Sequence, residues 1–286
     1  MIPLLKRSLT GVVLVAVVII AIYAGGFYMA ALLWLVMNLG LCEWRELCCK
    51  MQCGMPSFWL FLLGNMAYLA IVLVQYAQTS TIIQGAFVPL LGWGTVLVSA
   101  IMIISSIFRK EDGPWNKIWL RMGMVLAGVL YISVSLALLN FLAGSSLADG
   151  PHVLMGFFVL IWTGDVFAYL TGSLFGHHKL CERLSPSKTW EGAAGGFVFA
   201  LLAAFLWGKY VLFDMPLGIW MCMSGLIVLC GMLGDLVESK IKREAGVKDS
   251  GKILPGHGGI LDRFDSVLIA APVAVACWQI MAVLFG

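Results

Sequence analysis

The chain has 286 residues, of which 61% are hydrophobic and 12% charged, whereas soluble domains have roughly 45 to 50% apolar and about 25% charged residues. This leaves too little polar sequence to cover a soluble core, so an ordinary water-soluble domain is excluded and the apolar surplus must face lipid. The formal net charge of +3, without a basic tail, is too small for an electrostatic nucleic-acid binder, and we expect no nucleic-acid partner.

Long stretches almost free of charged residues predict membrane spans, because a spanning helix needs about 20 apolar residues. Residues 8–42 are too many for one crossing, and Ala24-Gly25-Gly26 offers a break that divides them into two. The polar stretch 75–84 likewise divides residues 51–108 into two crossings. One further helix is expected in each of five later stretches: 122–148, 150–176, 192–208, 215–234 and 266–286. The sequence therefore predicts an all-α, polytopic integral membrane protein with about nine transmembrane helices.

The distribution of Lys and Arg predicts the orientation, because these residues concentrate in cytoplasmic loops. With a cytoplasmic N-terminus and the C-terminus outside, nine spans place seventeen of the eighteen Lys and Arg in the cytoplasm and only Lys209 outside. Lys6-Arg7 and the apolar stretch after it could instead be a signal peptide ending near Ala24, but the immediate start of the next helix favours an uncleaved span. We expect one membrane domain over residues 1–286, in which 1–150 are mostly scaffold and 151–286 carry the catalytic helices and cytoplasmic loops.

Acids and bases are dense in the polar insertion 238–265, which by composition alone could be a solvated, self-neutralising loop. Spacing favours a site. If the helix that contains Asp235 continues, Ser239 and Lys242 share its face one and two turns further on. Asp262 lies three residues before Asp265 at the expected start of the last helix, so the two carboxylates should project to one side.

The carboxylates of this insertion suggest a metal site. Asp265 taken alone could simply complement a helix dipole. A partly buried carboxylate near a membrane boundary needs a cation, and one magnesium ion held by Asp235 and Asp262 would satisfy both.

Two other segments carry polar residues in unusual places. Asp165 lies in an apolar span without a cation, where an acid marks an ion or substrate path or makes a structural hydrogen bond. In the insertion 177–191, hydroxyl groups alternate with Lys179 and Lys188, which suits phosphate binding at a helix start, or else an ordinary helix cap. The glycines of Pro255-Gly256-His257-Gly258-Gly259 would let backbone N–H groups approach an anion closely.

These segments carry a family resemblance. The residues Ser239 to Arg243, then Lys248-Asp249, then residues 255–265 closely resemble the signature of the phosphatidate cytidylyltransferase (CDP-diacylglycerol synthase) family. Two upstream segments are similar to other parts of that family: Trp162-x-x-Asp165-x-x-Ala168-Tyr169 and Ser185-Pro186-x-Lys188-Thr189-x-Glu191-Gly192. The match covers the second half of the chain, from about residue 155. The resemblance implies a membrane enzyme of phospholipid biosynthesis that joins CTP to phosphatidic acid, using a divalent metal, to give CDP-diacylglycerol and pyrophosphate.

The resemblance and the charges together assign roles. Asp235 and Asp262 are assigned to Mg²⁺, with Asp265 as support, and another divalent or an additional cation is left open. The residues expected to be catalytic are Asp235, Asp262, Asp265, Lys242 and Arg243. The residues expected to contact the CTP or phosphatidate phosphates are Asp165, Lys179, Ser185, Lys188, Ser239, Lys240, Lys248, His257 and Arg263. Because the planar fork of Arg orients a phosphate, Arg243→Lys should cost more activity than its retained charge suggests.

The expected partners follow from this reaction. The acyl chains of the lipid substrate stay in the bilayer while its headgroup meets CTP, which indicates the cell (inner) membrane and a site facing the cytoplasm.

The small residues Gly192, Gly195 and Gly196 permit close contact between helices. This contact is favoured inside one subunit, and a homodimer is left open. An ion or phosphate transporter with Asp165 and Asp235 on its path is the alternative, and it would show uptake without CTP turnover. A CDP-lipid-consuming phosphatidyltransferase is disfavoured because no D-G-x-x-A-R segment occurs.

Overall fold

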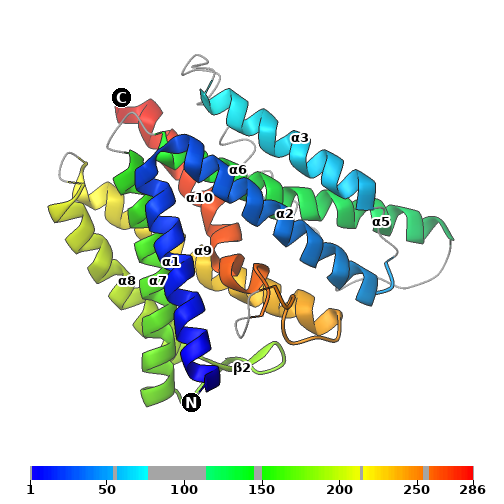
Figure 1. Cartoon of the computed structure of the whole chain (residues 1–286). Helices are drawn as coiled ribbons and strands as arrows, with labels where there is room; N and C mark the ends of the chain where they lie inside the picture. The colour runs from blue at the N-terminus through cyan, green and yellow to red at the C-terminus, as the bar shows by residue number, and fades with distance from the viewer. Residues whose placement is uncertain are drawn as a thin grey trace.

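The computed structural model describes residues 2–53, 57–76, 114–144, 150–212, 215–253 and 258–285, and most of them are helical (Figure 1). The helices are α1 (Ile2–Ala24), α2 (Gly26–Lys50), α3 (Ser57–Tyr76), α5 (Pro114–Gly128), the π-helix η1 (Val129–Val134), α6 (Ser135–Ala143), α7 (Gly150–Phe175), α8 (Trp190–Tyr210), α9 (Leu217–Glu244) and α10 (Leu261–Phe285). The strands β1 (Lys179–Cys181) and β2 (Ser185–Thr189) pair antiparallel. The all-α prediction is confirmed.

Seven helices within the described residues are long and apolar enough to cross a membrane, and each corresponds to a predicted span. The first predicted span is helix α1, whose described apolar part, Thr10–Ala24, is shorter than the others. The crossing predicted in residues 85–108 lies outside the described residues. The protein is thus a multi-pass helical membrane protein, whereas the count of nine and the sides of the two termini stay predictions.

The break between the first two helices is where the sequence predicts it. Helix α1 ends at Ala24 and α2 begins at Gly26, and between them Gly25 has a φ of 113°. Only glycine adopts this backbone conformation without steric cost, so the residue type explains the position of the break.

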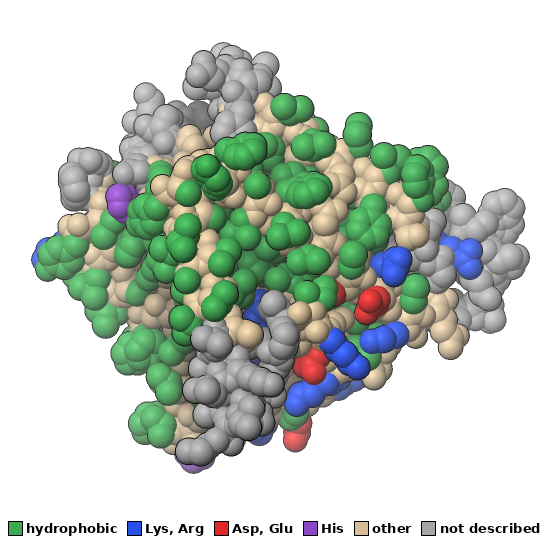
Figure 2. Space-filling view, in the orientation of Figure 1, with side chains coloured by type: hydrophobic (Ala, Val, Ile, Leu, Met, Phe, Trp, Pro, Cys, Tyr) green, Lys and Arg blue, Asp and Glu red, His purple; other side chains and the backbone are tan. Residues whose placement is uncertain are grey.

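Burial separates the inner helices from the outer ones. In both the α5–α6 span and α10, 72% of the apolar window is buried, compared with 22% in α3 and 28% in α8. Large apolar side chains are exposed on these outer helices, among them Phe58 and Leu73 of α3 and Val198 of α8. Figure 2 shows apolar side chains over most of the visible face and most of the charged ones gathered toward its lower edge. This separation suits a bundle that faces lipid around its sides and water at a polar end.

Helices α7 and α8 approach closely through small residues. A Cβ atom on Gly196 would lie 2.6 Å from the Gly164 carbonyl oxygen and 2.8 Å from Ala168 Cβ, and one on Gly195 would overlap Thr171. The glycines therefore pack within one subunit, as favoured from the sequence. A homodimer stays a prediction.

The polar insertion before α8 is a short β-hairpin, which the sequence did not indicate. Strands β1 and β2 hold Lys179 opposite Thr189, the residue that precedes α8. The Thr189 hydroxyl accepts a hydrogen bond from Gly192 N at 3.1 Å. Thr189 is therefore an ordinary N-cap, and the hairpin carries Lys188 to a fixed place beside α9.

Candidate functional site

Helices α9 and α10 form one wall of the polar end. As expected, α9 continues past Asp235 to Glu244, and Asp262 lies in the first turn of α10. The Lys242 ammonium group donates to Asp262 Oδ1 at 2.6 Å and to Glu238 Oε2 at 3.1 Å. The side chains of Glu238 and Asp262 are only 2% and 8% exposed, so one lysine lies between two largely buried carboxylates. Such a group is stable only while its charges stay paired.

The second oxygen of Asp262 is held by the preceding loop. Asp262 Oδ2 accepts from the backbone N–H groups of Ser250 at 2.9 Å and Gly259 at 2.8 Å, and lies 3.0 Å from the Ser250 hydroxyl. Gly258 has a φ of 82°, and a Cβ atom there would lie 2.6 Å from Asp262 Oδ2. The glycines do allow a backbone N–H group to approach an anion, and in this structure the anion is a carboxylate of the protein itself.

A more open group of acids lies beside this one. Asp235 of α9 forms an ion pair with Lys188 of β2 and accepts from the Ser239 hydroxyl at 3.5 Å. Asp165 of α7 is exposed and accepts from the Ser266 hydroxyl at 3.5 Å. Asp265 lies next to Ser266, and a Cβ atom on Gly234, the neighbour of Asp235, would lie very close to the Asp265 carbonyl oxygen. We call Asp165, Asp235 and Asp265 the acidic cluster; it brings together predicted residues from three helices and faces Lys188.

The remaining predicted residues that the structure describes lie on the hairpin, on α9 and α10, and in the loop between these two helices. Lys240 is 3.8 Å from Glu244, and the Ser185 hydroxyl is 3.5 Å from that of Ser187. Lys179 and Arg263 are exposed, and His257 lies outside the described residues. Their roles toward substrate stay predictions.

Arg243 contacts the protein backbone. Its Nε donates to the Leu184 carbonyl and its Nη1 to the Val247 carbonyl, both at 3.3 Å, which links α9 to the hairpin and to the following loop. A lysine has one ammonium group and cannot reproduce the two hydrogen bonds of the planar guanidinium group. We therefore expect Arg243→Lys to lower kcat/KM about tenfold or more, measured beside Arg183→Lys on the exposed hairpin turn as control. Equal activity of the two variants would contradict this expectation.

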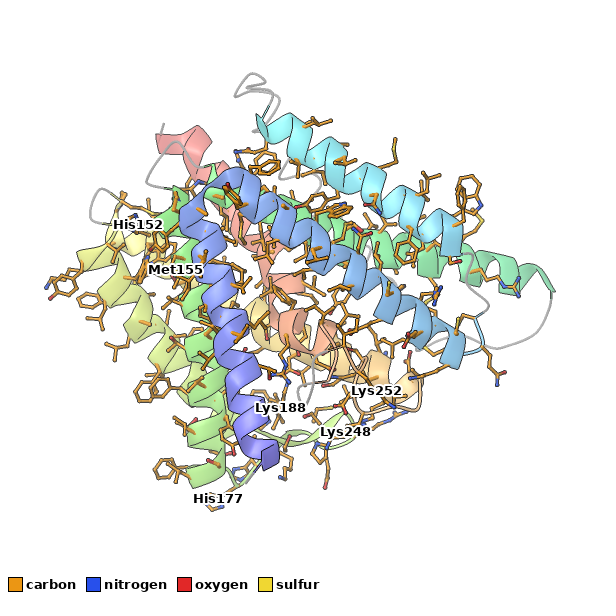
Figure 3. The ribbon with its side chains drawn as sticks, in the orientation of Figure 1. His152, Met155, His177, Lys188, Lys248 and Lys252 are labelled. Carbon is orange, nitrogen blue, oxygen red and sulfur yellow. The ribbon has the colours of Figure 1, made fainter. Side chains whose placement is uncertain are left out.

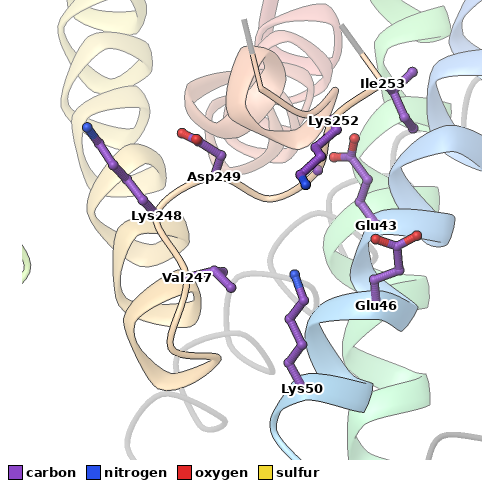
Figure 4. Close-up of a pocket in the computed structure, with 9 residues that line it drawn as sticks. Glu43, Glu46, Lys50, Val247, Lys248, Asp249, Lys252 and Ile253 are labelled. Carbon is purple, nitrogen blue, oxygen red and sulfur yellow. The ribbon is translucent and has the colours of Figure 1, made fainter.

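A cavity of about 650 Å³ opens at the polar end, between α2 and the loop after α9 (Figure 4). It is lined by Glu43, Glu46, Lys50, Val247, Lys248, Asp249, Gly251, Lys252 and Ile253. Figure 3 shows Lys188 and Lys248 at the same end of the bundle as Lys252. The volume is that of a small-molecule site, and lysines on both walls suit an anionic ligand.

The donor chemistry of this region fits a magnesium ion. Carboxylate oxygens are hard ligands, and Asp235 is only partly buried. Among the described residues no three acidic, His or Cys side chains gather closely enough to hold an ion alone. Magnesium sites in nucleotide enzymes commonly use one or two carboxylates and complete their coordination with substrate phosphates and water, so a two-carboxylate site remains suitable.

Three residues of this region were not expected from the sequence. Glu43 and Glu238 are each 1% exposed, and Ser250 is fully buried. Glu43 follows directly on an apolar stretch, and an acid in a membrane helix is itself a functional signal. Glu238 could have been found by its spacing, because it lies four residues before Lys242 on one helix.

The chain is similar to known proteins over most of its length. Residues 5–281 match the sequence profile described as the cytidylyltransferase family. A phosphatidate cytidylyltransferase of Haemophilus influenzae is 33% identical to the chain over 286 aligned residues, covering 93% of this chain and 96% of that protein. One from Staphylococcus saprophyticus is 30% identical with the same coverage, and one from Staphylococcus haemolyticus is 48% identical over 128 residues, 44% of this chain and 48% of that protein.

Proposed function

We infer that this chain, which belongs to the cytidylyltransferase family, is a phosphatidate cytidylyltransferase. It transfers CMP from CTP to phosphatidic acid and gives CDP-diacylglycerol and pyrophosphate. The observation that carries the proposal is the similarity to phosphatidate cytidylyltransferases over 93% of the chain. The polar end of the bundle, where acids and lysines gather beside lipid-facing helices, is suited to a reaction between a lipid and a nucleotide.

The geometry suits a direct transfer. A phosphate oxygen of phosphatidate attacks the α-phosphorus of CTP in line while pyrophosphate leaves, so no covalent enzyme intermediate is needed. Negative charge grows on the leaving group, and positioned cations stabilise it. Lys188 is partly exposed beside the acidic cluster, and Lys248 shares the cavity with Lys50 and Lys252. We assign these lysines to the phosphates.

A divalent metal completes the proposal. Asp235, together with Asp262, would hold Mg²⁺, and Asp265 would support them. A bound magnesium ion would neutralise charge on the phosphates. The structure supports Asp235 more directly, because Asp262 already accepts hydrogen bonds from Lys242, Ser250 and Gly259.

The location of the protein follows from its substrates. CTP is a cytoplasmic nucleotide and phosphatidic acid a membrane lipid, so the polar end should face the cytoplasm at the inner membrane. The predicted orientation, which places seventeen of eighteen Lys and Arg on that side, supports this assignment.

The proposal is tested with purified protein in lipid nanodiscs that contain phosphatidic acid. We expect labelled CTP to give lipid-linked cytidine, to require phosphatidic acid rather than diacylglycerol, and to stop with EDTA and resume with excess Mg²⁺. Phosphate and cation uptake is measured in parallel in proteoliposomes. Uptake without any cytidine transfer would contradict the assignment as an enzyme and favour a transporter. Activity unaffected by EDTA would contradict the proposed dependence on a divalent metal.

A further inference from the structure

Glu43 is a buried acid in the amino-terminal half of the chain, more than 100 residues before the first of the motifs already described. It lies on α2 and is 1% exposed. No Lys, Arg or His forms an ion pair with it within the part of the chain that the structure describes. A buried carboxylate is costly unless other groups stabilise its charge, so its partners need to be identified.

The partners of Glu43 are the start of α10 and the loop before it. Oε1 accepts from Ile260 N at 2.8 Å, and Oε2 accepts from Leu261 N at 2.9 Å and from the Ser250 hydroxyl at 2.8 Å. The first N–H groups of a helix have no partner within the helix, and its dipole favours a negative charge there. Glu43 therefore caps α10 from another helix.

Ser250 connects Glu43 to Asp262. Its hydroxyl is within hydrogen-bond distance of Glu43 Oε2, at 2.8 Å, and of Asp262 Oδ2, at 3.0 Å, and it has one hydrogen to donate. Its backbone N–H also donates to Asp262. A contact series thus runs from Glu43 through Ser250 to Asp262 and on to Lys242.

Two glycines show how closely the loop encloses this carboxylate. A Cβ atom on Gly251 would overlap the Glu43 carboxylate, and one on Gly259 would overlap both that carboxylate and the Ser250 hydroxyl. Figure 4 shows Glu43 extending from α2 toward the loop that carries Asp249 and Lys252. No side chain larger than hydrogen fits at either position while Glu43 keeps its place.

We propose that Glu43 is a positioning residue, which fixes the start of α10 and the loop at Ser250 and thereby holds Asp262 and Lys242 in their working geometry. The inference rests on the proposed function for its catalytic consequence. It assigns an active role to a helix in the region that the sequence indicated to be mostly scaffold. A misplacement of about 1 Å in such a site can cost about 100-fold in rate, so a shortened or neutral side chain at residue 43 should act mainly on kcat.

The test compares Glu43→Gln and Glu43→Asp with Glu182→Gln, an exposed acid on the hairpin turn, as control. Gln replaces one accepting oxygen by a donor that faces a backbone N–H, and Asp is too short to reach. We expect each Glu43 variant to lower kcat about tenfold or more, to change KM for CTP less than about threefold, and to raise the Mg²⁺ concentration needed for half-maximal rate. Glu182→Gln should behave as wild type.

Two further readouts separate positioning from general damage to the fold. Hydrogen–deuterium exchange of the ligand-free protein should speed up in peptides that contain Ile260 and Leu261, with α8 unchanged. The double variant Glu43→Gln/Ser250→Ala should lose little more activity than the worse single variant, because both interrupt one contact series. Unchanged exchange at α10, or losses that multiply, would overturn the proposal. If the wild type transfers no cytidine, the proposed function fails, while the exchange experiment still tests the contact.

Discussion

Replacing Lys242 with methionine should lower kcat/KM about 100-fold or more and destabilise the folded protein by about 3 kcal/mol or more. The reason is that Lys242 lies between Glu238 and Asp262, both nearly buried, and methionine keeps the apolar stem but removes the charge. Two nearly buried carboxyl groups then lie in a medium of low dielectric without the cation that both contact. Cytidine transfer measures the loss of activity, and thermal unfolding in detergent measures the loss of stability.

The control for this variant is Lys209→Met. Lys209 lies in the last turn of α8, away from the site, and is exposed beside the rings of Phe205 and Tyr210. Its replacement should change stability by no more than about 1 kcal/mol and leave turnover unchanged. Adding Glu238→Gln to Lys242→Met should recover part of the lost stability, because one of the two buried carboxyl groups left without the lysine is replaced by an amide. A Lys242→Met protein as stable and active as wild type would contradict the paired arrangement.

Replacing Asp262 with asparagine should abolish most turnover, by about 100-fold or more. The aspartate accepts from Lys242 on one oxygen and from Ser250 and Gly259 on the other. Asparagine has one accepting oxygen, so its amide group must face either the ammonium group or two backbone donors. The charge proposed to help hold the metal is lost at the same time. Asp262→Asn should therefore also need more Mg²⁺ for whatever activity it retains.

Folding of this variant is checked separately, because the same contacts stabilise the start of α10. Asp249→Asn changes an exposed acid of the same loop and should unfold at the wild-type temperature. If Asp262→Asn is folded at the assay temperature and inactive, the loss of activity arises from the change in the site and not from unfolding. If it is folded and active, Asp262 is neither a metal ligand nor the acceptor that positions Lys242.

Local patterns predicted much of the polar end. The spacing from Asp235 to Lys242 required one helix face, and α9 does continue through these residues. The three-residue spacing of Asp262 and Asp265 correctly placed both in the first turns of α10. Gly25 marked the break between α1 and α2 because its backbone conformation is one that glycine adopts readily. In each case the physical signal lies within a few residues of the feature it predicts.

Contacts between distant segments could not be predicted in this way. The hydrogen bond from Ile260 to Glu43 joins residues 217 apart in sequence, and no periodicity reports which helices pack together. Composition alone left open a solvated loop around Glu238, whereas the structure buries its side chain on α9, which packs against α10. Nothing in the sequence indicated the two backbone carbonyls to which the Arg243 guanidinium group donates, and its assignment to a phosphate stays a prediction.

The most direct measurement is the conversion of radiolabelled CTP by purified protein with phosphatidic acid and Mg²⁺, with wild type and Asp262→Asn assayed side by side. We expect wild type to form lipid-linked cytidine and a folded Asp262→Asn protein to form about 100-fold less. A demonstrably folded wild type that forms no lipid-linked product would contradict the enzyme assignment and favour transport. Equal product from both proteins would support the assignment as an enzyme and contradict the proposed role of Asp262 in the site.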